Sequence, residues 1–143
     1  MPIVPDDVCF NKVAIIERCL VRVFEEHLSD PNLSNWTHID ALVMNLEWAC
    51  QASIDLAMYL VSLERLGLPQ NSAEAFQLLG RAGILSAATT KSLAAMVGFR
   101  NVAVHAYQSL NLGVVKVIVE REWTVFVSFA QELGMTIKPR IPQ

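Results

Sequence analysis

The sequence has few charged residues and no excess of positive charge. Only 17% of its 143 residues are charged, and the net charge is −3. A protein that binds nucleic acid along a broad basic surface carries a clear positive excess, so this chain is not of that class. Any contact with nucleic acid must come from a local groove, which two copies of the chain can build together.

Long uninterrupted apolar runs are also missing. No window offers the roughly 18 apolar residues that a membrane-spanning helix requires, so we expect no membrane partner. The first ten residues, MPIVPDDVCF, carry acids where a signal peptide carries positive charge. These two features predict a cytoplasmic protein.

The sequence lacks the spacings that hold metal ions or pair cysteines. The number of cysteines is odd, and the three, Cys9, Cys19 and Cys50, form no C-x-x-C pattern. The three histidines lie far apart and form no H-E-x-x-H pattern. We therefore predict buried free thiols in a reducing compartment, no metal site and no cofactor.

Apolar residues, in contrast, are abundant. They make up 53% of a chain whose length fits a single domain, residues 1–143. This fraction is high for a soluble monomer and indicates an apolar surface that a partner or a second copy covers. We place the core at about residues 6–133 and expect the tail MTIKPRIPQ, residues 135–143, to be frayed.

The apolar residues recur at helical spacing, and no segment shows a competing strand pattern. The β-branched segment VVKVIVEREWTVFV is ambiguous by propensity, but its apolar residues fit a helical stripe better. We predict an all-α, antiparallel bundle of about five helices with short connections. The expected helices cover residues 6–28, about 35–66, about 72–83, about 84–107 and about 112–133.

One short stretch, GFRNVAVHAY at residues 98–107, places Arg100, Asn101, His105 and Tyr107 in an otherwise apolar helix. On a regular helix Arg100 and Tyr107 share one face, and Asn101 can orient His105 four residues later. His105 itself lies about 140° around the helix from Arg100. Either the helix breaks near His105, or a second copy of the chain completes the site.

These residue types suit the cleavage of a phosphodiester without a metal ion. Histidine exchanges protons near neutral pH. The planar guanidinium of arginine holds a phosphate and stabilises the charge that develops in the transition state. On spacing alone, a surface arginine and an ordinary helical histidine remain an alternative.

A polar stripe lies earlier in the sequence. It consists of Glu47, Gln51 and Asp55, which recur every four residues along the second expected helix. The stripe is either a solvated face or part of the site. In the second interpretation Gln51 or Asp55 faces the motif helix, where it steadies Arg100 or touches RNA.

With its neighbours, the stretch resembles a known family. Arg100, Asn101, His105 and Tyr107 match the R-N-x-x-x-H-x-Y form of the R-x-x-x-x-H-x-Y motif of HepT-like proteins, which belong to the HEPN superfamily. The resemblance covers about residues 10–133. It includes the segments NLEWACQASIDLAMYLV, FQLLGRAGIL and LAAMVGFRNVAVHAY.

The resemblance implies a homodimer of helical bundles with the two motifs paired at the interface. It implies a metal-independent ribonuclease toxin whose antitoxin is a minimal nucleotidyltransferase that silences it by AMPylation. When the roles of the family's motif residues are assigned to this sequence, Arg100 and His105 are catalytic, Tyr107 receives AMP, and Asn101 supports His105. The substrate would be RNA, with tRNA as one candidate. The alternative is a non-catalytic subunit that presents a nucleotide or polypeptide to a nucleotidyltransferase.

Overall fold

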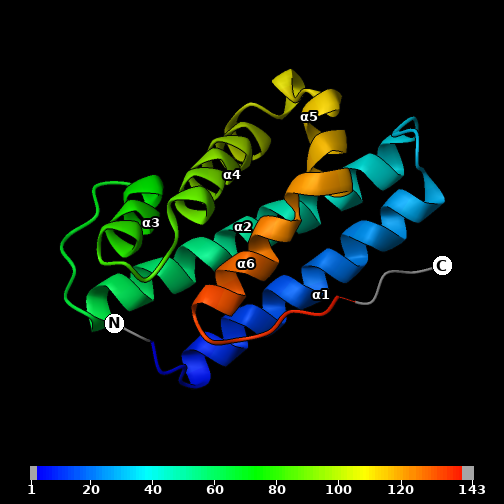
Figure 1. The fold of residues 1–143 in the computed structure, drawn as a ribbon. Coiled ribbons are helices and arrows are strands. Elements are labelled where there is room, and N and C mark those ends of the chain that lie inside the picture. Colours follow the sequence, from blue (N-terminus) through cyan, green and yellow to red (C-terminus); the bar gives the residue numbers. More distant parts are fainter. Residues whose placement is uncertain (1–2, 140–143) are drawn as a thin grey trace.

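The computed structural model describes residues 3–139, and all regular secondary structure in this part of the chain is helical (Figure 1). The predicted all-α class is therefore confirmed. The helices are α1 (Asp7–Ser29), α2 (Trp36–Leu63), α3 (Ser72–Arg81), α4 (Ala87–His105), α5 (Leu112–Val117) and α6 (Thr124–Glu132), with a 3₁₀ turn at Tyr107–Ser109 and a π-helical turn at Ile118–Glu122.

Short polar side chains fix where the helices begin. Each accepts a hydrogen bond from a backbone N–H two or three residues further on, which satisfies a donor that the first helical turn leaves free. Such caps are typically worth about 1 kcal/mol each. The capping residues are Asp6, Asn35, Asn71, Ser86 and Asn111.

Helix α2 is the centre of the bundle. It forms a long hairpin with α1, while α3 and α4 pack on it from the other side (Figure 1). The core between these layers contains Phe76 of α3 and Phe129 of α6, whose rings meet edge to face with their centroids 5.7 Å apart. Because α4 runs antiparallel to α2, the end of α4 lies beside the beginning of α2.

Helices α3 and α4 end about two residues before their expected ends. Two further differences concern α2 and the last expected helix. Helix α2 ends at Leu63, three residues early, where Arg65 takes a positive φ of 54°. The single helix expected at 112–133 is divided by the π-helical turn, in which the Trp123 N–H donates to the Ile118 carbonyl at 2.9 Å. This wider turn shifts the register of the helix by one residue. At its end Trp123 packs edge-on against Phe24 of α1, with the ring centroids 4.9 Å apart.

The expectation of a frayed tail is wrong for residues 135–139, and residues 140–143 lie outside the described part of the chain. After a turn at Gly134, Met135 and Ile137 are only 5% and 2% exposed. The Lys138 N–H donates to Glu17 of α1 at 2.8 Å, and the segment runs along α1 (Figure 1). Two apolar side chains and one backbone hydrogen bond therefore extend the core beyond residue 133.

Substitution of Ile137 by alanine tests this docking. We expect Ile137→Ala to lower the free energy of unfolding by about 2–5 kcal/mol, because it removes buried methyl groups and leaves a cavity. Urea unfolding followed by circular dichroism measures the change. Lys138→Ala, which alters an exposed side chain next to it, should change the value by less than about 0.5 kcal/mol. Equal stabilities of the two variants would show that the segment does not dock in solution.

The three cysteines are buried and free, as predicted. Among residues 3–139, no three side chains of histidine, cysteine, aspartate or glutamate come close enough to hold a metal ion together. None of the helices described here combines the length and the apolar character needed to cross a membrane.

Candidate active site at the end of helix α4

Helix α4 ends at His105. Ala106 leaves the helical conformation, with φ −144° and ψ 46°, although its N–H still bonds to the Val102 carbonyl at 2.9 Å. Tyr107 then begins the 3₁₀ turn. The break therefore redirects Tyr107 and leaves His105 about 140° around α4 from Arg100. The prediction that Arg100 and Tyr107 share a face of one regular helix is wrong, because that helix does not reach Tyr107.

The redirected Tyr107 side chain meets α2. Its phenol O–H donates a hydrogen bond of 2.5 Å to Oδ1 of Asp40, which lies 67 residues earlier in the chain. Burial raises the pKa of Tyr107 well above its ordinary value, and the hydrogen bond and negative charge of Asp40 raise it further. The phenol is therefore neutral at physiological pH.

Asp40 was missing from the residues selected by sequence. A signal for it did exist, because Asp40 lies seven residues before Glu47 and so extends the polar stripe of α2 by two helical turns. Nothing in the sequence indicated that Tyr107 would be its partner, since that contact depends on how α4 ends and how it crosses α2.

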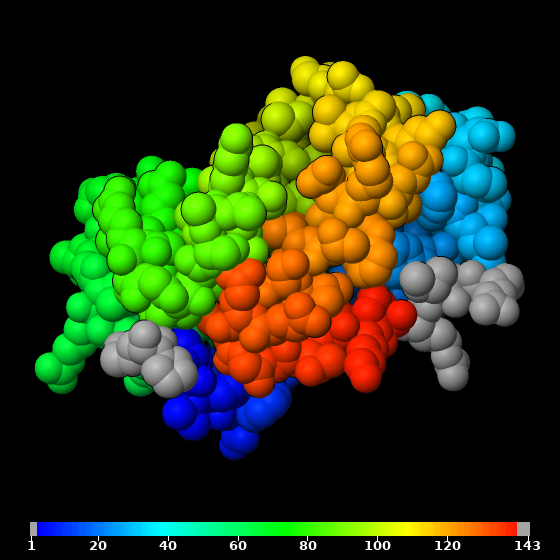
Figure 2. All heavy atoms as spheres, in the orientation of Figure 1, coloured from blue at the N-terminus to red at the C-terminus, as the bar shows by residue number. Residues whose placement is uncertain are grey.

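An open groove of about 560 Å³ lies between α2 and the end of α4. The α2 wall is mixed and the α4 wall is apolar. Tyr107 and Asp40 close one end of it. The lining residues are Asp40, Met44, Glu47, Ala103, Val104 and Tyr107. The residues around this end of α4 form an edge of the molecule (Figure 2).

Arg100, near the end of α4, also approaches α2. Burial raises the pKa of the Cys50 thiol on α2 to about 12, and the charge of Arg100 opposes this rise, which places the guanidinium near Cys50. Arg100 is half-buried, and its Nε is enclosed without an acceptor among residues 3–139. An unsatisfied buried donor costs about 1–3 kcal/mol, so the fold does not hold this arginine for stability alone.

Asn101 does not orient His105, contrary to the expectation. Its Oδ1 accepts a hydrogen bond of 3.2 Å from Nη1 of Arg100. The guanidinium is a charged donor, and its hydrogen bond engages the amide oxygen. His105 is exposed and makes no hydrogen bond within the described residues, so its imidazole is free to meet a substrate.

Gln51 and Asp55 bond to each other, and Asp55 also contacts α1. The Gln51 amide donates to Asp55 at 2.8 Å, and the Lys12 ammonium of α1 lies 3.4 Å from the same carboxylate. Residues spaced by four drift about 40° around a helix at each step, so the stripe turns from α4 toward α1 along its length. Neither residue is hydrogen-bonded to Arg100 within residues 3–139, and their support of Arg100 stays a prediction. A contact of either residue with RNA stays a prediction.

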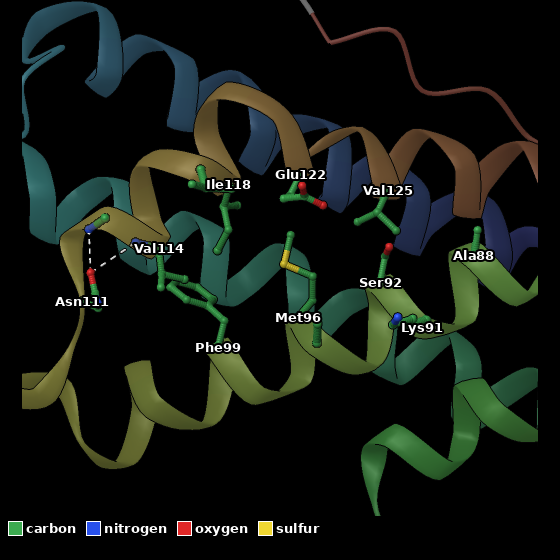
Figure 3. A pocket seen from close by; sticks show the side chains of 13 residues that line it. Ala88, Lys91, Ser92, Met96, Phe99, Asn111, Val114, Ile118, Glu122 and Val125 are labelled. Carbon is green, nitrogen blue, oxygen red and sulfur yellow. Dashed lines mark hydrogen bonds between the residues drawn. The ribbon is translucent and has the colours of Figure 1, made fainter.

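A second, larger groove lies elsewhere on the described part of the chain. It has a volume of about 770 Å³ and lies between α4 and the α5–π-turn segment (Figure 3). Met96 and Phe99 of α4 face Val114 and Ile118 across it. None of the four motif residues lines this groove, so the size of a cavity does not locate the motif.

Known proteins with similar sequences and folds complete this description. A family model described as "Ribonuclease HepT-like" matches residues 14–133. A curated protein of Shewanella oneidensis named mRNA nuclease HepT is 34% identical over 125 residues, which cover 87% of this chain and 94% of that protein.

Solved structures agree with this similarity. One is a tri-AMPylated Shewanella oneidensis HEPN toxin in complex with an MNT antitoxin. It has a TM-score of 0.86 and 33% identity, and the match covers 91% of this chain and 98% of that one. A toxin–antitoxin structure with AMP-PNP also has a TM-score of 0.86 and 33% identity, over 90% of this chain and 98% of that one.

The helical fold is thus that of the HEPN toxins. Within that class, the chain belongs to the HepT-like ribonuclease family. The predicted family is confirmed, whereas the individual roles of Arg100, His105 and Tyr107 stay predictions.

Proposed function

We propose that this chain is the ribonuclease toxin of a toxin–antitoxin pair and that it cleaves RNA with Arg100 and His105. The observation that carries the proposal is the exposure and the hydrogen bonding of these two side chains. His105 is exposed and free of hydrogen bonds within residues 3–139, and Arg100 has an unpaired buried nitrogen. The relative named mRNA nuclease HepT supports the same activity.

In this proposal the two side chains divide the chemistry. His105 takes the proton of a ribose 2′-hydroxyl while that oxygen attacks the adjacent phosphorus and forms a 2′,3′-cyclic phosphate. The bond from phosphorus to the 5′-oxygen of the next nucleotide breaks, and that oxygen leaves as a hydroxyl with a proton from solvent. Arg100 binds the phosphate through its outer nitrogens and stabilises the negative charge of the pentacovalent state. Neither step requires a metal ion.

The experiment that tests this function is cleavage of RNA by the purified chain in the presence of a chelator. The assay uses tRNA and mRNA. Transfer RNA is the candidate named with the family resemblance, and the relative is named for mRNA. A chain that binds RNA or nucleotides without ever cleaving would favour the alternative, a non-catalytic subunit of a nucleotidyltransferase.

We also propose a homodimer that completes the site. Arg100 and His105 point about 140° apart on α4, so one copy does not bring both to the same phosphate. Apolar side chains surround the motif on the outer surface: Met44, Val102 and Val104 are 48%, 37% and 38% exposed. An apolar patch beside an incomplete site is typical of an interface between copies.

Sedimentation at micromolar concentration should therefore give a dimer. Val104→Lys should weaken the association at least about tenfold, because it buries an unpaired charge in the interface. Leu68→Lys, at a residue 85% exposed in the loop between α2 and α3, is the matched control and should stay dimeric. A wild-type chain that sediments as a clean monomer would contradict the composite site.

The partner in this proposal is a minimal nucleotidyltransferase antitoxin that transfers AMP from ATP to Tyr107. The solved toxin that is tri-AMPylated and bound to an MNT antitoxin supports it. Tyr107 is the motif tyrosine, and its hydroxyl lies at the end of an open groove. RNA, ATP and the partner meet in the cytoplasm, the compartment we propose.

A further inference from the structure

The contact between Tyr107 and Asp40 has a chemical consequence beyond positioning. The phenol O–H and the Asp40 carboxylate are 2.5 Å apart, although the two residues belong to different elements. Asp40 is exposed, and within residues 3–139 it forms no ion pair. Its carboxylate thus has no structural partner besides the tyrosine.

We propose that Asp40 is the general base for the AMPylation of Tyr107, so that the toxin supplies a catalytic group for its own inactivation. The inference rests on the proposed modification of Tyr107. The phenol oxygen attacks the α-phosphorus of ATP, and an O–P bond forms. The bond from that phosphorus to the oxygen bridging to the β-phosphate breaks, and pyrophosphate leaves. The phenol proton passes to Asp40 and from there to solvent.

Such a base is needed because a neutral phenol is a weak nucleophile. Even an ordinary tyrosine is ionised to only about one part in a thousand at neutral pH, and the raised pKa of Tyr107 makes the phenolate rarer. A base must lie within hydrogen-bond reach of the proton that it takes, and Asp40 does.

No other group of this groove competes for the role. The α4 wall beside the phenol consists of Ala103 and Val104, which carry no titratable group. On α2 the other acid of the groove is Glu47, two helical turns from Asp40 and without a hydrogen bond to the phenol among the described residues. Asp40 is therefore the group of this chain placed to take the proton.

The competing interpretation is that Asp40 only holds the tyrosine in place. Asp40→Asn distinguishes the two, because asparagine keeps the size and an acceptor oxygen but is not a base. The substitution also removes the negative charge that helps to raise the pKa of Tyr107, so more phenolate is present at a given pH. A purely positional role thus predicts an equal or faster reaction, whereas a base predicts a slower one.

The experiment follows AMP addition by intact-mass spectrometry, with the nucleotidyltransferase partner and ATP. Near neutral pH, Asp40→Asn should react about 100-fold more slowly than wild type. Both rates are measured with the same partner at each pH, so their ratio does not contain the pH dependence of the partner's own activity. As the pH rises from about 6 to 9, the rate of Asp40→Asn relative to the wild-type rate should increase by up to tenfold per pH unit. The phenol of the variant must lose its proton without the help of a base.

Two further variants complete the design. Asp40→Glu keeps a carboxylate and should restore most of the rate and the wild-type pH dependence. Glu25→Gln makes the same carboxylate-to-amide change at an exposed residue of α1 and should react within about twofold of wild type. Circular dichroism checks that each variant is folded.

The outcomes separate this inference from the function on which it rests. A wild-type chain that never carries AMP on Tyr107 would remove the proposed modification itself. A wild-type chain modified on Tyr107, with Asp40→Asn equally fast at every pH, would leave the modification standing and overturn the role of Asp40. In that case the base belongs to the partner.

Discussion

Replacement of His105 by alanine should reduce RNA cleavage by about a thousandfold or more. In the proposed mechanism His105 exchanges a proton with the substrate, and loss of a general base costs about 10²–10⁴ in rate. Because the imidazole is exposed and makes no hydrogen bond within residues 3–139, helicity and melting temperature should stay almost unchanged. Gel analysis of cleaved RNA and thermal unfolding measure the two effects.

The same assay tests the metal-independent mechanism. Wild-type cleavage should persist in EDTA, because residues 3–139 present no cluster of ligands for a catalytic ion. Activity that disappears with the chelator and returns with magnesium would contradict proton transfer by His105. A His105→Ala variant as fast as the wild type would remove the site assignment.

AMPylation of Tyr107 should silence the nuclease by at least about 100-fold. The AMP phosphate would compete with RNA for the guanidinium of Arg100, and the attached purine would obstruct the path of RNA beside Tyr107. Incubation with the partner and ATP should therefore raise the mass of the chain by one or more AMP units as cleavage is lost.

Tyr107→Phe is the control for this prediction. It lacks the phenol oxygen, so it should escape modification and keep at least part of its cleavage activity in the presence of partner and ATP. Peptide mass spectrometry locates the modified residue. AMP on a different residue, or none at all with a demonstrably active partner, would leave Tyr107 with a structural or substrate-contacting role.

The sequence alone determined the features that depend on neighbouring residues. The apolar periodicity predicted an all-helical bundle, and the starts expected at residue 6 and at about residue 35 lie within one residue of the starts of α1 and α2. These signals are reliable because they act over a few residues and are repeated along each helix. The R-x-x-x-x-H-x-Y motif, read with its flanking segments, identified the family for the same reason.

Only the tertiary structure decided which distant groups meet. The end of α4 at Ala106 directs Tyr107 to Asp40, 67 residues away, and the tail docks on Glu17 across 121 residues. Asn101 accepts from Arg100 where helical spacing alone indicated His105. Such contacts depend on how helices cross and where each one stops, and local propensities leave both open because the packing of the whole core determines them.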